Sequence, residues 1–359
     1  MTQFLMILMA AGVVCGGLDR LAGNRFGLGD KFEEGFTLLG PLALSMAGVI
    51  CLMPMLAALL QKVVAPLCAA LGVDPGVFGG ILAIDMGGYQ LAMDLASLPS
   101  VGRFSGIVVA ATFGCTVVFT IPVGMALVPA ESRPLFARGL LAGLIALPPA
   151  LLVGGLMSGL GAGQTLRQCL PVFLIALLLL WGLLRHPNGL LRGFSALSGV
   201  IRAAATVGLI LGAVQHLTGW TPLPLTPLRE AMSIVSSIAI ALLGCLPLAE
   251  LLQRALKKPF LWLGRRTGMN ATGAAALLIG FVSVTPALGM FRRMDRRSAV
   301  VNAAALVCGA SALSAHLAFT VAAEPGLTAA LLVSKGLGAL LGVCLALFFT
   351  RRGASPADP

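Results

Sequence analysis

The sequence has few charged residues, few aromatic residues and no long polar segment. Charged residues make up 10% of the 359 positions and aromatic residues 6%, with a single tyrosine. A soluble domain has about 25% charged residues, so this composition excludes a soluble globular protein. Apolar residues make up 58% of the chain, and they gather in runs long enough to cross a bilayer. The sequence therefore predicts an all-α polytopic membrane protein.

Other absences exclude further classes of protein. The three histidines (His186, His216 and His316) are isolated, and the eight cysteines form no Cys-x-x-Cys pair, so neither a metal centre nor a disulfide framework is indicated. The net charge of +11 lies mainly in loops and forms no patch with aromatic residues, which argues against nucleic-acid binding. No nucleotide-binding loop occurs, and no cofactor is expected.

One apolar segment, Pro75 to Ala96, is interrupted at its centre by Asp85, Gly87 and Gly88. A carboxylate at this depth costs about 2.5–3.5 kcal/mol on insertion scales and by default marks a functional site. A broken helix that lines a polar cavity explains all three residues. The alternative is a carboxylate that only bonds a neighbouring helix.

The two halves of the chain show a weak internal repeat with an offset of about 195 residues. Matched positions include Pro54 with Pro247, Pro66 with Pro259, and Gly114 with Gly309. We interpret residues 1–163 as the first repeat, 164–194 as a linking transmembrane helix and 195–359 as the second repeat. The broken segment 75–96 then corresponds to a second one, 271–291. Paired interruptions of this kind indicate the binding site of a transporter.

The distribution of Lys and Arg favours one topology. If every apolar segment spans the membrane there are eleven spans, and the loops on both sides carry similar numbers of basic residues. If the two broken segments are re-entrant, most basic loop residues fall on one side, as the positive-inside rule requires. We therefore predict nine transmembrane helices plus two re-entrant hairpins, two inverted repeats, an outer N-terminus and an inner C-terminus. Expected spans include 35–60 and 298–322, with amphipathic pieces at 62–74 and 254–266.

Several strings resemble one family. They are KFEEGFTLLGPLALSMAGV (31–49), VDPGVFGGILAIDMGGYQLAMDLA (73–96), LLGCLPLAELLQRALKKP (242–259), TPALGMFRRMD (285–295) and AHLAF (315–319). In order and spacing they resemble the EutH-type permeases of bacterial ethanolamine utilisation. The resemblance implies an inner-membrane permease that lets ethanolamine, notably its protonated form, enter the cell.

The chain departs from the family pattern at two places. Enteric-type members carry Asn-Asn-Ile-Pro in the second broken segment, where this chain has Ser283-Val284-Thr285-Pro286. They also carry an Asp before the later histidine, where this chain has Ala315. Both positions lose polarity, which leaves the preferred amino alcohol open.

Candidate substrate-binding residues in the first broken segment are Asp85, Met86, Gly87, Gly88, Tyr89 and Gln90. An ammonium group that leaves water needs a carboxylate or carbonyl oxygens, so Asp85 is the expected charge partner. Gly87 and Gly88 would free backbone carbonyls. Tyr89 offers a hydroxyl or a cation–π face, or it is an interfacial anchor. Gln90 would bond the substrate hydroxyl or a neighbouring helix.

Candidates elsewhere are Glu34, Ser283, Thr285, Pro286, Asn302 and His316. Glu34 would attract a cation to the mouth of the pathway or cap a helix. The hydroxyls of Ser283 and Thr285 would face the substrate beside the Pro286 break, or bond to their own helix. His316 and, more weakly, Asn302 would bond the substrate or serve as buried structural groups.

The leading hypothesis is a permease for ethanolamine in the bacterial inner membrane, with the substrate and the lipid bilayer as its partners. A carrier of another small amine or polar solute is the main alternative, since a scaffold does not fix a substrate. A membrane-embedded enzyme is less favoured, because it would need clustered acids, histidines or metal ligands. A homo-oligomer is left open.

Overall fold

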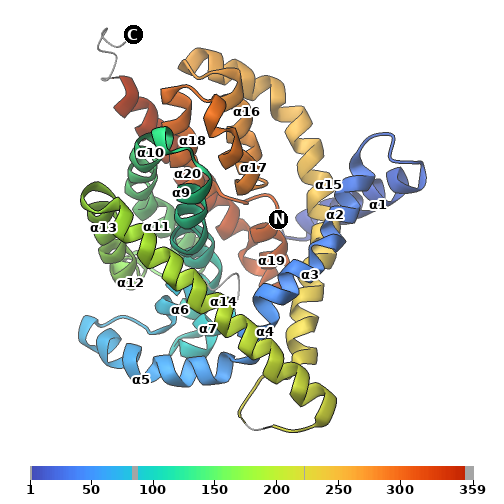
Figure 1. Ribbon diagram of the computed structural model, residues 1–359, viewed down its shortest axis with the longest axis vertical. Helices are drawn as coiled ribbons and strands as arrows, with labels where there is room; N and C mark the ends of the chain where they lie inside the picture. Colours follow the sequence, from blue (N-terminus) through green and yellow to red (C-terminus); the bar gives the residue numbers. More distant parts are fainter. Residues whose placement is uncertain (1, 83–87, 222, 352–359) are drawn as a thin grey trace.

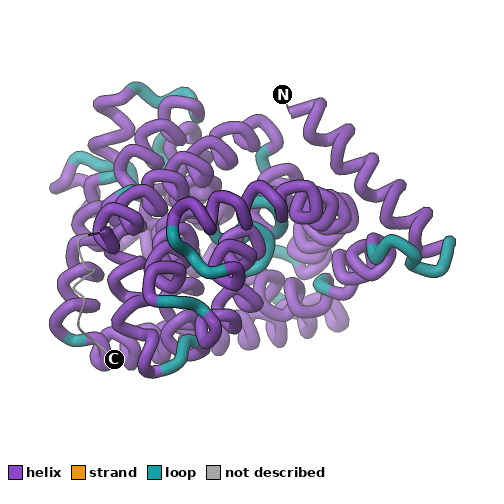
Figure 2. The backbone as a smooth tube through the Cα atoms, turned by 90° about the horizontal axis from the view of Figure 1, so that it is seen from above, coloured by secondary structure: helices purple, strands orange, loops and turns teal. Residues whose placement is uncertain are grey.

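The computed structural model describes residues 2–82, 88–221 and 223–351, and all regular structure in these ranges is helical (Figure 2). Seven of the described helices are long and apolar enough to cross a membrane, or up to nine if each of two bent pairs is one span. Their outer faces are apolar: Leu59, Val63 and Leu67, one turn apart on one helix, are all more than half exposed. Exposed apolar stripes of this kind suit contact with lipid, so the protein is a polytopic membrane protein.

Helices of the first half are interrupted often (Figure 1). They are α1 (Thr2–Leu21), α2 (Leu28–Thr37), α3 (Leu39–Leu42), the π-helix η1 (Ala43–Ala47), α4 (Gly48–Cys51), α5 (Met53–Leu71), α6 (Gly76–Leu82), α7 (Gly88–Leu95), α8 (Pro99–Phe104), the π-helices η3 (Ser105–Gly114) and η4 (Thr116–Thr120), α9 (Ile121–Leu127), the 3₁₀ turn η5 (Ala130–Ser132), α10 (Arg133–Ile145) and α11 (Leu147–Met157). The expected span 35–60 is thus divided at Leu52, and the 62–74 piece belongs to α5.

The second half has longer helices, beginning after the linking pair α12 (Ala162–Gln168) and α13 (Leu170–Arg185). They are α14 (Pro187–Thr218), α15 (Leu228–Thr267), α16 (Ala271–Gly280), α17 (Val284–Gly289), the 3₁₀ turn η6 (Met290–Arg293), α18 (Arg296–Gly309), α19 (Ala315–Ala323), the 3₁₀ turn η7 (Pro325–Leu327) and α20 (Thr328–Arg351). The 194/195 boundary expected between linker and second repeat falls inside α14.

Two expected segments of this half have different bounds in the structure. The basic piece 254–266 is the C-terminal end of α15, which continues through Pro247 and Pro259 for 40 residues. At 1.5 Å per residue α15 is roughly 60 Å long, about twice the thickness of the hydrocarbon core. The expected span 298–322 is not continuous, since it is interrupted between α18 and α19.

Each broken segment folds as an antiparallel pair of short helices. A Cβ on Gly76 of α6 would meet Ala96, and one on Gly79 would lie 2.3 Å from the Ala92 nitrogen. The later glycine of α6 thus contacts the earlier of the two alanines, so α6 and α7 run in opposite directions. In the second pair, Asn270 lies against Arg293 and Gly280 against Ala287, again antiparallel. We call these pairs the first and second hairpins.

A polar residue ties the two ends of each hairpin together. Asp74 accepts backbone N–H groups from Gly76 at 2.8 Å, Ser97 at 3.2 Å and Leu98 at 2.9 Å, so the chain returns to the level where it began. Asn270 accepts the N–H of Gly273 at 2.7 Å and donates to the Arg293 carbonyl at 2.8 Å. Both hairpins therefore start and finish at one place.

Two similar glycine contacts join α1 to α15 and α14 to α4. A Cβ on Gly12 of α1 would lie 2.4 Å from the Gly244 carbonyl oxygen of α15. A Cβ on Gly208 of α14 would lie 1.9 Å from the carbonyl oxygen of Gly48 in α4. The backbones touch because these residues lack side chains, which is how apolar helices pack closely in lipid. Gly12 and Gly208 are separated in sequence by the offset of the predicted repeat, and so are Gly48 and Gly244.

Candidate functional site

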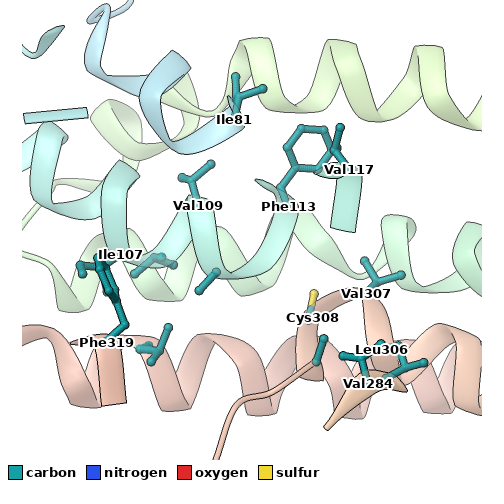
Figure 3. Close-up of a cluster of buried hydrophobic side chains, with 14 of the residues drawn as sticks. Ile81, Ile107, Val109, Phe113, Val117, Val284, Leu306, Val307, Cys308 and Phe319 are labelled. Atoms are coloured by element: carbon teal, nitrogen blue, oxygen red, sulfur yellow. The ribbon is translucent and has the colours of Figure 1, made fainter. Parts of the chain in front are cut away.

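A small cavity of about 160 Å³ lies where the π-helical segment faces α19. Its lining comes from both halves of the chain: Gly106, Ile107, Ala110, Ala111, Cys115, Val118, Phe119, Ser311, Ala315, His316, Phe319 and Thr320. Ile107 and Phe319 lie against each other in the apolar part of this wall (Figure 3). The polar side chains are few, and they belong mainly to the second half. A cavity of this size suits a small solute.

The backbone of the first half is π-helical along this wall. η3 and η4 follow α8 almost without a break, and every residue of η3 is buried. π-Helical turns are rare and frequently occur at functional sites. The Thr116 hydroxyl joins the segment to the second half by donating to the Val307 carbonyl at 2.6 Å. The irregular turns thus face the second half of the chain.

The opposite wall is built where the chain leaves helical structure after α16 and between α18 and α19, and these two segments hydrogen-bond to each other. The N–H of Ser311 donates to the Gly280 carbonyl at 3.1 Å, and that of Leu313 donates to the Phe281 carbonyl at 2.9 Å. The Ser314 hydroxyl donates to the Val282 carbonyl. The carbonyls freed where α16 ends are therefore used by the 310–314 segment. Ser311 has φ 50°, a left-handed conformation that is uncommon outside glycine.

His316 presents a defined tautomer to the small cavity. Its Nδ1 lies 2.9 Å from the Ala310 carbonyl oxygen, and a carbonyl can only accept, so Nδ1 carries the proton in the neutral ring. Nε2 is then left with a lone pair. The side chain is 8% exposed and lines the cavity, so Nε2 can accept a hydrogen bond from an ammonium or a hydroxyl group.

A second, polar cavity of about 550 Å³ adjoins the small one. The two share Phe119, Ser311 and Ala315 in their linings. The polar cavity is lined in addition by Lys31, Glu34, Leu38, Pro41, Leu42, Ser45, Leu242, Leu246, Glu250, Gln253, Ile279, Val282, Ser283, Pro286 and Ser314. Its carboxylates are partnered: Glu34 pairs with Lys31 at 2.6 Å and Glu250 with Arg254 at 2.7 Å.

Tyr89, at the start of α7, connects the first hairpin to the small cavity. Its ring packs edge-on against Phe319, with centroids 6.1 Å apart, and its backbone abuts Gly106. Both neighbours line the cavity. The Tyr89 hydroxyl donates to a Glu324 carboxylate oxygen at 3.0 Å.

Comparison with known proteins identifies the family. The family model described as "Ethanolamine utilisation protein, EutH" matches residues 1–349. The chain belongs to the EutH family. It is 36% identical to a protein named probable ethanolamine permease EutH from Listeria monocytogenes, over 98% of this chain and 94% of the relative. It is 33% identical to the protein of the same name from Escherichia coli, over 89% and 85%. A Bacillus subtilis protein, YxeR, is 35% identical over 96% and 94%. No solved structure matches.

This membership confirms the family expected from the sequence strings. The EutH relatives are named as permeases, so the chain is a transporter, not an enzyme. Its apolar helices agree with a multi-pass membrane protein. A permease takes a small-molecule substrate and lies in a lipid bilayer, as predicted.

The structure brings together part of the predicted EutH site. His316 lines the small cavity, and Glu34, Ser283 and Pro286 line the polar cavity next to it. Gly88 is buried at the start of α7, beside Tyr89. Asp85, Met86 and Gly87 lie outside the described residues.

Three predicted residues lie away from these cavities. The Asn302 side chain donates to the Gly273 and Ser298 carbonyls at 2.9 Å each, so it fastens α18 to α16. Thr285 is exposed and is not part of either lining. Gln90 is half-buried on α7 and also belongs to neither lining.

Sequence reasoning missed three residues of the site. Phe119 appears in the linings of the small cavity, the polar cavity and a third cavity beside α14. Nothing in the sequence separates it from other apolar residues. Glu324 carries a usable signal, because it is a lone acid between two apolar segments. Lys335 carries one too, because a charge deep within an apolar segment is by default a functional candidate.

Proposed function

We propose that this EutH-family chain imports ethanolamine, as its protonated cation, across the inner membrane of a bacterial cell. The observation that carries the proposal is the small cavity, where irregular backbone from both halves meets around a few polar side chains, in a chain that matches ethanolamine permeases along its length. Transport sites in comparable architectures lie at such repeat interfaces.

The proposed site places complementary groups around the substrate. Nε2 of His316 accepts a hydrogen bond from the substrate ammonium or hydroxyl. Asp85 supplies the carboxylate that a desolvated ammonium needs. In the sequence it lies between the end of α6 at Leu82 and the start of α7 at Gly88, next to Tyr89. Met86, Gly87 and Gly88 contribute backbone oxygens, and the polar cavity with Glu34 and Ser283 forms the approach.

We further infer nine spans, two re-entrant hairpins and two inverted repeats. The similar glycine contacts and the antiparallel hairpins support this arrangement. In Figure 1 the first hairpin lies toward the bottom and the second toward the top. In this arrangement α18 and α19 form one interrupted span. α5 corresponds to the basic end of α15, and both lie along the membrane surface.

A small uncharged polar solute is the second candidate. Within the described part of the chain, no carboxylate lines the small cavity, so a cation there would depend on Asp85.

The test is uptake of labelled ethanolamine in bacteria that lack their own permease. At acidic pH the amine is protonated and crosses the bilayer poorly, so uptake reports on the protein. The wild-type chain should restore uptake, and Asp85→Asn at equal abundance should lower it by at least about tenfold, the equivalent of roughly 1.4 kcal/mol. Asp30→Asn, at an exposed position, is the matched control. Equal uptake by wild type and Asp85→Asn would show that Asp85 is not the cation partner.

A further inference from the structure

Lys335 is a buried cation in the middle of an apolar helix. It lies in α20, which forms most of the candidate span Pro325–Arg351, and it is 0% exposed. Its ammonium group donates to the carbonyl oxygen of Ala111 in η3. One carbonyl partner leaves most of the charge uncompensated, and a lysine at this depth costs about 2.5–3.5 kcal/mol on insertion scales. Such a residue is a functional candidate by default.

No carboxylate compensates Lys335 within the residues that the structure describes, since it forms none of the ion pairs found there. The titratable groups that interact with it electrostatically are Cys115, Cys308 of α18 and His316 of α19. α11, which packs on α20 through the Ser334–Ala150 hydrogen bond, has no titratable residue.

The remaining neighbouring helix, α10, brings no charge close. Gly143 of α10 lies against Gly342, about two turns of α20 beyond Lys335. The two arginines of α10, Arg133 and Arg138, precede Gly143 and lie further away along this antiparallel contact.

Lys335 lies directly behind the wall of the small cavity. Ala111, which accepts its hydrogen bond, lines the cavity, and so do Cys115 and His316. A substrate ammonium in the cavity would therefore lie near a second cation with little water between them. Two like charges at short range in a low dielectric repel strongly, so a cation in the cavity favours the uncharged form of Lys335.

We propose that Lys335 exchanges its proton for the substrate cation during each transport cycle; this deepens the proposed function and rests on it. As ethanolammonium enters from outside, an N–H bond of Lys335 breaks and the proton passes to water in the cavity and returns outside. After the substrate leaves to the cytoplasm, the amine takes a proton from that side. One cation enters, one proton leaves, and no net charge moves. The exchange is thermodynamically equal to import of the uncharged amine.

The test uses the full-length protein in proteoliposomes, at pH values where ethanolamine is almost entirely protonated. Initial uptake and final accumulation are measured under an inside-negative potential or an inside-acid gradient, with protein-free vesicles subtracted. Wild-type uptake should follow the pH gradient and ignore the potential. Uptake by Lys335→Met should follow the potential and ignore the pH gradient. A potential of about 60 mV, about 1.4 kcal/mol per charge, should raise its accumulation about tenfold.

Two further variants complete the design. Lys335→Arg keeps a permanent cation and should remain folded, as judged by gel filtration and melting temperature, with uptake below about a tenth of wild type. Lys62→Met, at an exposed position, should behave as wild type.

Several results would overturn the proposal. Potential-driven uptake by wild type would overturn it and leave the proposed function intact. A Lys335→Met variant that behaves as wild type, or that is folded but inactive, would also overturn it. Full activity of Lys335→Arg would overturn it as well. A wild-type protein that carries no ethanolamine would remove the proposed function itself and this inference with it.

Discussion

The anchors of the two hairpins, Asp74 and Asn270, should not be interchangeable, although they occupy corresponding places. Asp74 is 6% exposed and is surrounded only by donors: the N–H groups of Gly76, Ser97 and Leu98. Asn270 both accepts, from Gly273, and donates, to the Arg293 carbonyl. The first site requires a carboxylate and the second an amide.

The cost of exchanging them can be estimated from these bonds. In Asp74→Asn one carboxylate oxygen becomes an NH₂ group, which faces an N–H donor and leaves it unsatisfied. A buried unsatisfied donor costs about 1–3 kcal/mol. In Asn270→Asp the helix cap on Gly273 survives, because Asp and Asn cap equally well. The bond to the Arg293 carbonyl is lost, and a second carboxylate approaches Asp295, which accepts the Asn270 N–H at 3.1 Å. The lost bond is exposed, so water can replace it, and we expect a smaller cost of about 0.5–1.5 kcal/mol.

Thermal unfolding of the purified protein in a single detergent measures both costs. Asp74→Asn and Asn270→Asp should each melt below wild type. Asp30→Asn removes the same charge as Asp74→Asn from an exposed side chain at a helix start, where about 0.3–1 kcal/mol is at stake. If Asp74→Asn melts at the same temperature as Asp30→Asn, the hydrogen bonds to Asp74 do not hold the first hairpin, and the reasoning is wrong.

Two other substitutions test the packing around the cavities. Tyr89→Phe keeps the ring contact with Phe319 but loses the hydrogen bond to Glu324. It should lower the free energy of unfolding by about 1 kcal/mol and reduce ethanolamine uptake at acidic pH. Unchanged uptake would show that this hydrogen bond has no role in transport. Gly273→Ala should cost about 1–3 kcal/mol by overpacking, because its Cβ would lie 2.2 Å from the Cβ of Ser298. Gly163→Ala, with open space around it, should not lower the melting temperature, and a loss there equal to that of Gly273→Ala would refute the steric argument.

The site could be predicted in part, and the division has a physical cause. His316, Ser283 and Pro286 were predictable because polar groups and proline inside apolar segments are costly and therefore stand out. Asn302 also stood out by polarity, but its bonds are structural, and only the packing of α18 on α16 reveals this. Phe119 carried no signal, since an apolar residue in a membrane segment is ordinary whether it borders a cavity or lipid.

The sequence by itself determined the membrane class, the family and the position of both hairpins, because these depend on composition, local strings and the cost of polar groups in apolar runs. Tertiary structure decided the break at 310–314, the bond between Tyr89 and Glu324, and the burial of Lys335 behind the small cavity. Each depends on segments far apart in the chain: the carbonyls at the end of α16 interrupt the 298–322 span by accepting its N–H groups, and Ala111 reaches Lys335 across more than half the sequence. Local patterns do not encode such contacts, which arise only when the two halves pack together.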